Sequence, residues 1–345
     1  MKVAIIGATG YGGIELIRLL QQHPYFSIAS LHSFSQIGDC IANTYPHLRN
    51  VLVHTLQEID VDVIGKEARI VFLATPAGVS AELTPKLLAA GLKVIDLSGD
   101  FRMVDPSLYE IWYKKPAAKE EILQKAVYGL SEWKRSEVQN ADLIANPGCF
   151  ATAALLAIAP LTRNGMIEAD SLIIDAKSGV TGAGKTPTTM THFPELYDNF
   201  HIYKVNKHQH VPEIEQMLAE WNDETKPITF STHLIPISRG IMVTLYAKVK
   251  QGAQIQSLQK LYEETYHHSP FVRIRSQGEF PSPKEVRGSN YCDIGSDYDE
   301  RTGRVTVVSV IDNMMKGAAG QAIQNANLLA GLEETAGLQH MPLYP

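Results

Sequence analysis

The sequence contains few cysteines, and their spacing argues against two classes of protein. Only three of the 345 residues are cysteines, and they are widely scattered, at Cys40, Cys149 and Cys292. An odd number without paired spacing is not typical of a disulfide-stabilised secreted domain and indicates a reducing compartment. Neither a CxxC nor an HxxxH spacing occurs, so no metal site is expected.

Long apolar runs and an excess of positive charge are also missing. Gly7 interrupts the apolar N-terminus short of a signal-peptide core, and the longest later apolar run, 150–161, is too short to span a bilayer. With 31 basic and 37 acidic residues the net charge is −6, which gives no general attraction to nucleic acid or membrane. We therefore expect a soluble cytoplasmic protein that acts on a small molecule, with a length that suits two domains.

The first part of the chain alternates short apolar strands with amphipathic helices. We predict strands at 2–6, 27–32, 69–73, 93–97 and 142–145. Helices are predicted after the first strand, ending near His23, and over 79–90. This alternation is typical of a parallel, doubly wound α/β sheet with helices on both faces. Residues 1–148 are thus expected to form a Rossmann-type domain.

The pattern changes after residue 148. We predict a helix at 150–161, strands at 172–176, 228–237, 241–249 and 304–311, and a last helix at 316–329. The two longer strands lie close together in sequence, around Ser238-Arg239-Gly240. This closeness favours an antiparallel or mixed sheet in a second, α+β domain over 149–312.

A glycine-rich turn follows the first strand and opens a helix. Glycines with GxxGxxG spacing allow a tight turn, a close approach of the backbone to a pyrophosphate, and close packing of helix on strand. The free N–H groups at the start of the helix also favour an anion. We predict that this turn binds a dinucleotide through Gly7, Thr9, Gly10, Tyr11, Gly12 and Gly13. The alternative is an ordinary glycine-rich βα turn.

The segment after the second strand bears on the choice of cofactor. An NAD enzyme usually places Asp or Glu there to bind the ribose 2′-hydroxyl. This chain has no acid before Asp39, and Ser33 and Ser35 can donate hydrogen bonds to a 2′-phosphate. The residues therefore favour NADP, while the lack of an arginine leaves NAD open.

Cys149 lies where a strand gives way to a helix. In Asn146-Pro147-Gly148-Cys149 the asparagine suits a helix cap and the proline suits the first helical position. Cys149 would then lie in the first turn, where the helix dipole lowers a thiol pKa. We predict that Cys149 is a nucleophile, and interpret Cys40 and Cys292 as inert packing residues.

Four other segments are candidates for the same site. His208-Gln209-His210 is compatible with an idle surface loop, but a nucleophilic cysteine needs an acid/base partner and histidine titrates near neutrality. Arg102, after the strand that ends at 97, can bind a phosphate or carboxylate. The glycine-rich loop 179–184 can bring N–H groups to the same anions, and Asn313 precedes the last helix, where its amide can meet a cofactor.

Taken together, these segments resemble the type 1 N-acetyl-gamma-glutamyl-phosphate reductase family, in the semialdehyde dehydrogenase superfamily. The matching stretches cover nearly the whole chain in order. They are GATGYGGIEL (7–16), DLSGDFR (96–102), YGLSE (128–132), NPGCFAT (146–152), SGVTGAGK (178–185), HQHVPEI (208–214), HLIPISRGI (233–241), GSNYCDIG (288–295) and DNMMKGAAGQAIQNAN (312–327).

The resemblance implies a fold, an oligomer and a reaction. It implies a Rossmann domain rejoined by a C-terminal helix within 313–345, and a catalytic domain like that of glyceraldehyde-3-phosphate dehydrogenase. It also implies a homodimer or homotetramer. The implied reaction is the NADPH-dependent reductive dephosphorylation of N-acetyl-gamma-glutamyl phosphate in arginine biosynthesis, through a Cys149 thioester.

By motif, Cys149 falls on the family nucleophile and His210 on its acid/base. The positions expected to bind substrate are Arg102, Ser178, His208 and Glu213, with Lys185 and Arg239 as further candidates. Thr75, Pro76, Gly182 and Asn313 are further candidates for the cofactor. The chain has Gln209 where the family commonly has Arg, and Phe150-Ala151 where Tyr-Pro is frequent, and both departures leave the catalytic pair intact.

Three alternatives remain open from the sequence. Aspartate-semialdehyde dehydrogenase shares the cysteine and the reaction class, but its usual Arg/His signature does not match HQHVPEI. A LysW-linked aminoadipyl-phosphate reductase of lysine synthesis is closer. A non-enzymatic NADP-sensing regulator could keep the glycine turn, but it would not need Cys149 together with His210.

Overall fold

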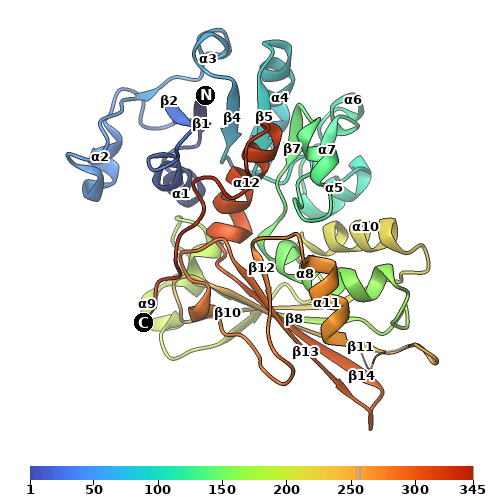
Figure 1. The fold of residues 1–345 in the computed structure, drawn as a ribbon. Coiled ribbons are helices and arrows are strands. Elements are labelled where there is room, and N and C mark those ends of the chain that lie inside the picture. The colour runs from blue at the N-terminus through green and yellow to red at the C-terminus, as the bar shows by residue number, and fades with distance from the viewer. Residues whose placement is uncertain (254, 256–257, 345) are drawn as a thin grey trace. The chain divides into compact units, whose positions relative to one another are not determined.

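The computed structural model describes residues 1–253, 255 and 258–344, which form two compact units (Figure 1). The first unit consists of Met1–Pro147 and Ala318–Gln339. The second consists of Gly148–Gly317 together with the last residues from His340. The division after Gln339 has no counterpart in the sequence pattern.

The first unit is built on a sheet of seven parallel strands in the order β3-β2-β1-β4-β5-β7-β6. The strands are β1 (Lys2–Ile6), β2 (Ser27–His32), β3 (Leu56–Gln57), β4 (Ile70–Leu73), β5 (Lys93–Asp96), β6 (Ala126–Tyr128) and β7 (Leu143–Ala145). Every residue of β4 is buried, as expected for a strand with helices on both faces. The predicted parallel sheet is confirmed, and the strand order reverses between β1 and β4.

The helices of this unit include three that were predicted, near the first strand, over 79–90 and over 316–329, and several that were not. They are α1 (Tyr11–Leu20), α2 (Ile41–Thr44), α3 (Val61–Glu67), α4 (Val79–Ala89), α5 (Pro106–Tyr113), α6 (Glu120–Leu123), α7 (Arg135–Gln139) and α12 (Gly320–Leu329). Side chains of β1, β4 and β5 pack with those of α3 and α4 into one apolar core. The short helices carry too little apolar periodicity to be predicted from sequence.

Helix α12 is buried although it carries several amide side chains. The side chains of Gln321 and Asn325 both donate to the carbonyl oxygen of Gly129, at 2.9 and 2.8 Å. The hydroxyl of Ser131 donates to the Asn325 Oδ1 at 2.7 Å. Because buried amides are costly unless they are hydrogen-bonded, these contacts give the glutamines and asparagines of the GQAIQNAN segment a structural role.

The second unit contains a mixed sheet of seven strands in the order β12-β13-β14-β11-β8-β10-β9. The strands are β8 (Ile173–Gly179), β9 (His201–Tyr203), β10 (Thr229–Ile235), β11 (Ile241–Lys248), β12 (Val272–Ile274), β13 (Cys292–Asp299) and β14 (Arg304–Ile311). The predicted mixed sheet is confirmed. However, β10 and β11 are not neighbours, because β8 lies between them, parallel to β10 and antiparallel to β11.

The helices of this unit are α8 (Cys149–Arg163), α9 (Phe193–Leu196), α10 (Val211–Trp221) and α11 (Leu258–Tyr266), and a π-helix over Met315–Ala319 precedes α12. Helix α8 packs on β11 and β14 and contacts α10 and α11 (Figure 1). The hydroxyls of Tyr262 and Tyr266 donate to carbonyl oxygens of α8, which fixes α11 on it. Within the described residues, no helix is long and apolar enough to cross a membrane.

The stability of the first unit is expected to fall as the solution becomes acidic. Burial lowers the pKa of His23, His32 and His54 below the ordinary value of 6.5. The His23 Nδ1 accepts the amides of Tyr25 and Phe26, so the neutral ring is the bound form. Its Nε2 bonds the Asn327 Oδ1 at 3.0 Å and joins the end of α1 to α12.

The sign of this pH dependence follows from proton binding. Because the folded pKa values are lower, the unfolded chain binds more protons below about pH 6.5. The stabilisation is therefore present above that pH and is lost as the pH falls towards the folded values. We expect the urea midpoint to drop between about pH 7 and about pH 5.5, with a smaller drop in His23→Gln. A midpoint that is constant over this range would contradict the prediction.

Candidate active site

The glycine turn after β1 fits a dinucleotide. Gly7 has a φ of 87°, and a Cβ there would stand 2.7 Å from the carbonyl carbon of Ala74. A Cβ on Gly13 would stand 2.7 Å from the Cα of Ala8, so both positions need glycine. At Gly10 and Gly12 a Cβ would meet nothing closer than 3.5 Å. Gly10 caps α1 without a side-chain hydrogen bond, so the first-turn N–H groups can receive a phosphate.

Predicted cofactor residues gather beside this turn at the carboxyl edge of the parallel sheet. The hydroxyl oxygens of Thr9 and Ser33 are 3.4 Å apart, and the Ser35 amide donates to the Ser33 Oγ at 3.4 Å. Ser33 is buried and Ser35 is exposed, so only Ser35 presents its side chain openly. The sequence did not point to Tyr45, whose hydroxyl donates to the Thr9 carbonyl at 2.9 Å.

Thr75 and Pro76 follow β4, the strand next to β1. The hydroxyl of Thr75 lies 2.9 Å from that of Ser80, in the first turn of α4. Pro76 is exposed. Both residues therefore lie at the point where the strand order reverses, which is where doubly wound sheets bind ligands.

Arg102 is buried and bound to the backbone of the first unit. Its Nε donates to the Asn146 carbonyl at 2.8 Å, and its Nη2 donates to the Leu97 carbonyl at 3.2 Å. These bonds link the loop after β5 to the loop after β7. Because the guanidinium is planar, these bonds fix the orientation of the group.

The acids of DLSGDFR have structural roles that the sequence did not reveal. Asp100 accepts hydrogen bonds from the amides of Gly78 and Ala81 and from the hydroxyl of Tyr109. Its carboxylate therefore caps the start of α4 from another loop. Asp96 accepts the amides of Ser98 and Gly99. Burial, and then the neighbouring charge of Asp100, raise the pKa of Asp96.

Cys149 is the first residue of α8, which confirms its predicted place in the first turn. The predicted cap was wrong, because the N-cap is Gly148 and not Asn146. The Asn146 side chain is used elsewhere: its Nδ2 donates to the Ala318 carbonyl, and its Oδ1 accepts from Asn325. Gly148 leaves the helix without a side-chain cap, and the dipole of α8 favours negative charge at the thiol.

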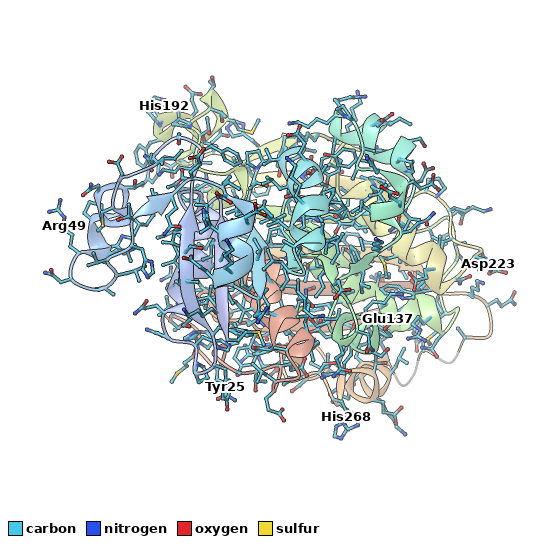
Figure 2. All side chains as sticks on the ribbon, turned by 90° about the horizontal axis from the view of Figure 1, so that it is seen from above. Tyr25, Arg49, Glu137, His192, Asp223 and His268 are labelled. Atoms are coloured by element: carbon cyan, nitrogen blue, oxygen red, sulfur yellow. The ribbon has the colours of Figure 1, made fainter. Side chains whose placement is uncertain are left out.

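The two predicted histidines are buried against the turn that carries Cys149. His208 and His210 are 5% and 6% exposed, whereas His192 and His268 extend from the surface (Figure 2). A Cβ on Gly148 would stand 2.6 Å from two ring carbons of His210 and closer still to its Nε2. The imidazole of His210 therefore rests on the residue that precedes the nucleophile.

His208 contacts His210 through a hydrogen bond and through its ring. Its Nδ1 accepts the His210 amide at 3.2 Å, so the proton of its neutral ring is on Nε2. The two ring centroids are 4.6 Å apart, and both rings make edge contacts with Phe150, at 5.3 and 6.1 Å. This packing excludes the interpretation of the segment as an idle surface loop.

Tyr203 belongs to the same group, and no motif in the sequence marks it. It lies on β9, and its ring makes an edge contact with His208 at 6.0 Å. Burial raises the pKa of Tyr203, and the negative charge of a Cys149 thiolate raises it further. The phenol is therefore within electrostatic range of the nucleophile and keeps its proton.

Ser178, Gly182 and Asn313 are brought together in the second unit. Ser178 is buried near the end of β8, and a Cβ on Gly182 would stand 2.9 Å from its Oγ. Asn313 accepts the Gly240 amide at 2.8 Å and donates to the Thr181 hydroxyl at 2.9 Å. Its amide thus holds the glycine-rich loop after β8.

The other two predicted substrate residues are placed differently. The Arg239 guanidinium pairs with the buried carboxylate of Asp312 at 3.0 Å. Asp312 also accepts the Gly288, Met314 and Met315 amides, so this ion pair organises the turn after β14. Lys185 is exposed in the loop after Gly184.

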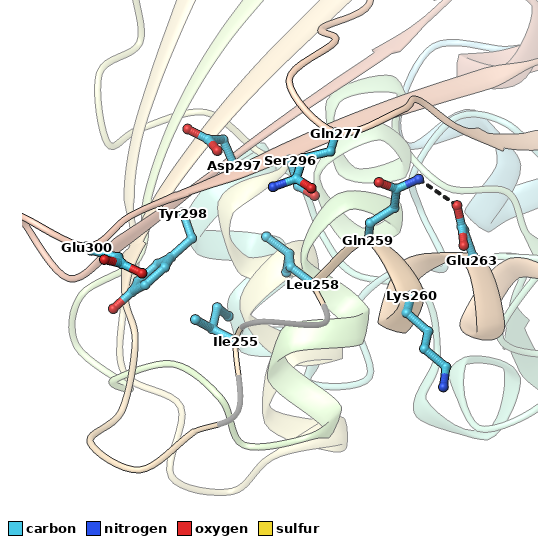
Figure 3. Close-up of a pocket in the computed structure, with 10 residues that line it drawn as sticks. All are labelled: Ile255, Leu258, Gln259, Lys260, Glu263, Gln277, Ser296, Asp297, Tyr298 and Glu300. Carbon is cyan, nitrogen blue, oxygen red and sulfur yellow. Dashed lines mark hydrogen bonds between the residues drawn. The ribbon is translucent and has the colours of Figure 1, made fainter.

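A pocket elsewhere in the second unit does not carry this chemistry. It has a volume of about 570 Å³ and is lined by ten residues of α11, β13 and the segments beside them (Figure 3). Its ionisable side chains include Lys260, Glu263, Asp297 and Glu300, with no cysteine or histidine in the lining. Across the described residues, no group of three or more histidine, cysteine or acidic side chains is placed to hold a metal.

Comparison with known proteins identifies both halves of the chain. Residues 2–141 match the family model of the semialdehyde dehydrogenase NAD binding domain. Residues 149–313 match that of the semialdehyde dehydrogenase dimerisation domain.

Close relatives match over the full length. The chain is 86% identical over 344 residues to "N-acetyl-gamma-glutamyl-phosphate reductase" of Bacillus cereus (strain B4264), with 100% of both chains covered. It is 85% identical over 345 residues to the protein of the same name of Bacillus mycoides (strain KBAB4), again with 100% of both covered.

Solved structures show the same fold at low identity. Aspartate semialdehyde dehydrogenase II from Vibrio cholerae, complexed with ASA, superposes with a TM-score of 0.72 at 19% identity, over 96% of this chain and 98% of that one. The aspartate semialdehyde dehydrogenase with NADP from Candida albicans gives a TM-score of 0.71 at 18% identity, over 95% and 98%. At these identities the likeness concerns the fold alone.

Proposed function

The chain belongs to the N-acetyl-gamma-glutamyl-phosphate reductases of the semialdehyde dehydrogenase family, and from this premise we propose a reaction for it. It reduces N-acetyl-gamma-glutamyl phosphate to N-acetylglutamate semialdehyde with NADPH, in arginine biosynthesis. The observation that carries the proposal is the full-length identity of 86% to a reductase of that name. The packing of His210 on the turn before Cys149 supports the covalent chemistry.

The first step is attack of the Cys149 thiolate on the acyl carbonyl. The carbon–sulfur bond forms as the carbon–oxygen bond to phosphate breaks, which leaves a thioester and free phosphate. Covalent catalysis of this kind divides one difficult reduction into two easier steps. The position of Cys149 at the start of α8 supports the thiolate, because the helix dipole stabilises a negative charge there.

The second step converts the thioester to the aldehyde. A bound nicotinamide cofactor supplies the hydride for this reduction. Collapse of the resulting tetrahedral adduct breaks the carbon–sulfur bond and returns the Cys149 thiolate. His210 is proposed to take the proton of the Cys149 thiol when the thiolate forms and to donate a proton to the oxygen of the tetrahedral adduct, which it takes back as the adduct collapses. Such a role is worth about 10²–10⁴-fold in rate.

Substrate groups are assigned to the remaining polar residues. Arg102 is proposed to bind the phosphate, and its bonds to two backbone carbonyls support this role by preorganising the guanidinium. Ser178 and His208 are proposed to contact the rest of the substrate. Lys185 and Arg239 are secondary candidates, because one is exposed and the other is paired with Asp312.

The cofactor and the assembly follow from the two family domains. Gly7, Gly10 and Gly13 are proposed to hold the pyrophosphate, with Thr75, Pro76, Gly182 and Asn313 as further contacts. NADP is proposed over NAD because no carboxylate follows β2 and Ser35 is open to a 2′-phosphate. A homodimer or homotetramer, assembled through the second unit, is proposed for the cytoplasm.

Substrate preference tests the proposal. With phosphate present, the protein is expected to oxidise N-acetylglutamate semialdehyde with NADP⁺ at least ~10²-fold more efficiently than aspartate semialdehyde, because a site built for an amide leaves polar groups unpaired against a free amine. Initial rates with both aldehydes and with a carrier-bound aminoadipate semialdehyde give this ratio, and NAD⁺ in place of NADP⁺ tests the cofactor. A preference for either rival aldehyde overturns the substrate assignment.

A further inference from the structure

Other residues of the second unit contact Gly148 at its N–H group, at its carbonyl oxygen and at its Cα. Its N–H donates to the Glu213 Oε1 at 2.7 Å, and its carbonyl accepts the amide and the hydroxyl of Thr152 at 2.8 and 3.1 Å. Its Cα faces the ring of His210, with no space for a side chain. The residue before the nucleophile therefore has a single position.

Two of these groups come from the same turn of α10. His210 is the N-cap of α10 and Glu213 lies in its first turn, three residues later, so both side chains project from one side of the helix. The Glu213 carboxyl group is fully buried. Because burial of a carboxyl group is costly unless it is hydrogen-bonded, the bond from the Gly148 amide stabilises the group in this position.

We propose that Glu213 is a positioning residue, which holds the turn carrying Cys149 against His210 through the amide of Gly148. This differs from the role that the motif suggests for Glu213, namely contact with the substrate. One turn of α10 then supplies both His210, the proton carrier, and Glu213, which keeps Cys149 correctly placed relative to His210. The inference rests on the proposed function, in which Cys149 is the nucleophile and His210 its partner.

Helix α10 offers a matched control for this role. Glu215 lies two residues further along, is half-buried, and its Oε1 accepts the Ile228 amide at 2.9 Å. It therefore makes the same kind of carboxyl-to-amide bond from the same helix, but to a segment that does not carry the nucleophile. Glu213→Ala and Glu215→Ala each remove one such bond.

The experiment measures Cys149 alkylation by iodoacetamide across a pH series, with the site identified by mass spectrometry, and kcat and KM for the aldehyde. In Glu213→Ala we expect kcat to fall about 10²-fold, the loss that a displacement of about 1 Å can cause, with KM changed less than about threefold. The pH at which Cys149 alkylation reaches half its maximal rate should shift as well. Glu213→Gln should keep most of the alkylation rate, since its amide oxygen can still accept from Gly148.

Three outcomes would overturn the proposal. They are a raised KM with an unchanged alkylation profile in Glu213→Ala, an equal loss in Glu215→Ala, and a Glu213→Gln variant as impaired as the alanine variant. If Glu213→Ala does not fold, Glu213→Asp takes its place with the same expected loss, because it withdraws the carboxyl group from Gly148 by one methylene. Alkylation needs no substrate, so its result does not depend on whether the proposed substrate is the right one.

Discussion

Cys149→Ala is expected to abolish turnover, with a loss on the order of 10⁶-fold in kcat, as found when the nucleophile of a covalent enzyme is removed. Alanine has no atom that can form the thioester, so neither half of the reaction can proceed. The change should leave the fold intact. The Cys149 Cβ packs closely against Gly317, because a Cβ built on that glycine would lie only 2.8 Å from it. Alanine keeps this Cβ, so the packing is retained.

Mass spectrometry gives the direct measurement for this prediction. The wild-type protein mixed with acyl phosphate, without NADPH, should carry one acyl adduct on Cys149, and the alanine variant should carry none. Cys40→Ala is the control and should keep full activity, because Cys40 lies outside the site that the sequence and the family motif indicate. An adduct on Cys40 or Cys292, or an active Cys149→Ala variant, would rule out the covalent mechanism.

The parallel sheet and the start of α8 could be predicted because local sequence patterns determine both. The predicted apolar strands, of four to six residues, alternate with helices, and this alternation indicates a doubly wound sheet. Glycines at 7 and 13 mark the turn because backbone atoms occupy the space where their side chains would be. Cys149 was placed correctly because a strand ends just before it.

The order of strands in the second unit could not be predicted in the same way. β10 and β11 are separated by five residues in sequence, but β8 lies between them in the sheet. The position of β8 depends on pairings with segments more than 50 residues away, which no local pattern records. The same limit explains the wrong cap at Asn146, whose side chain is taken by contacts to 318 and 325.

The candidate site, too, could be predicted only as far as local sequence patterns reach. The sequence indicated which residue types carry the chemistry, because Cys149 and His210 fall in recognisable motifs. It did not indicate that Gly148 is the residue on which Glu213 and His210 meet, because that contact joins segments some 60 positions apart. Tyr203 was missed for the same reason, since its neighbours in space are far away in sequence.

The contact between Gly148 and His210 leads to the second large expected effect, that of Gly148→Ala. The backbone at Gly148 has φ −68° and ψ 150°, which alanine adopts without strain. The added methyl group, however, would stand 2.6 Å from two ring carbons of His210. The imidazole must then move by about 1 Å, and a displacement of that size at a catalytic group can cost about 10²-fold in rate.

A double-mutant cycle separates this contact from general damage to the fold. Gly148→Ala should lower kcat about 10²-fold in the wild-type background and much less in a His210→Ala background, where the clashing ring is gone. Gly65→Ala serves as the control, because its Cβ would make only an ordinary contact of 3.4 Å with the Ala90 Cβ. Equal losses from Gly148→Ala in both backgrounds would mean that the methyl group acts on Cys149 or on the Glu213 bond. The packing of His210 on Gly148 would then not be what positions the imidazole for catalysis.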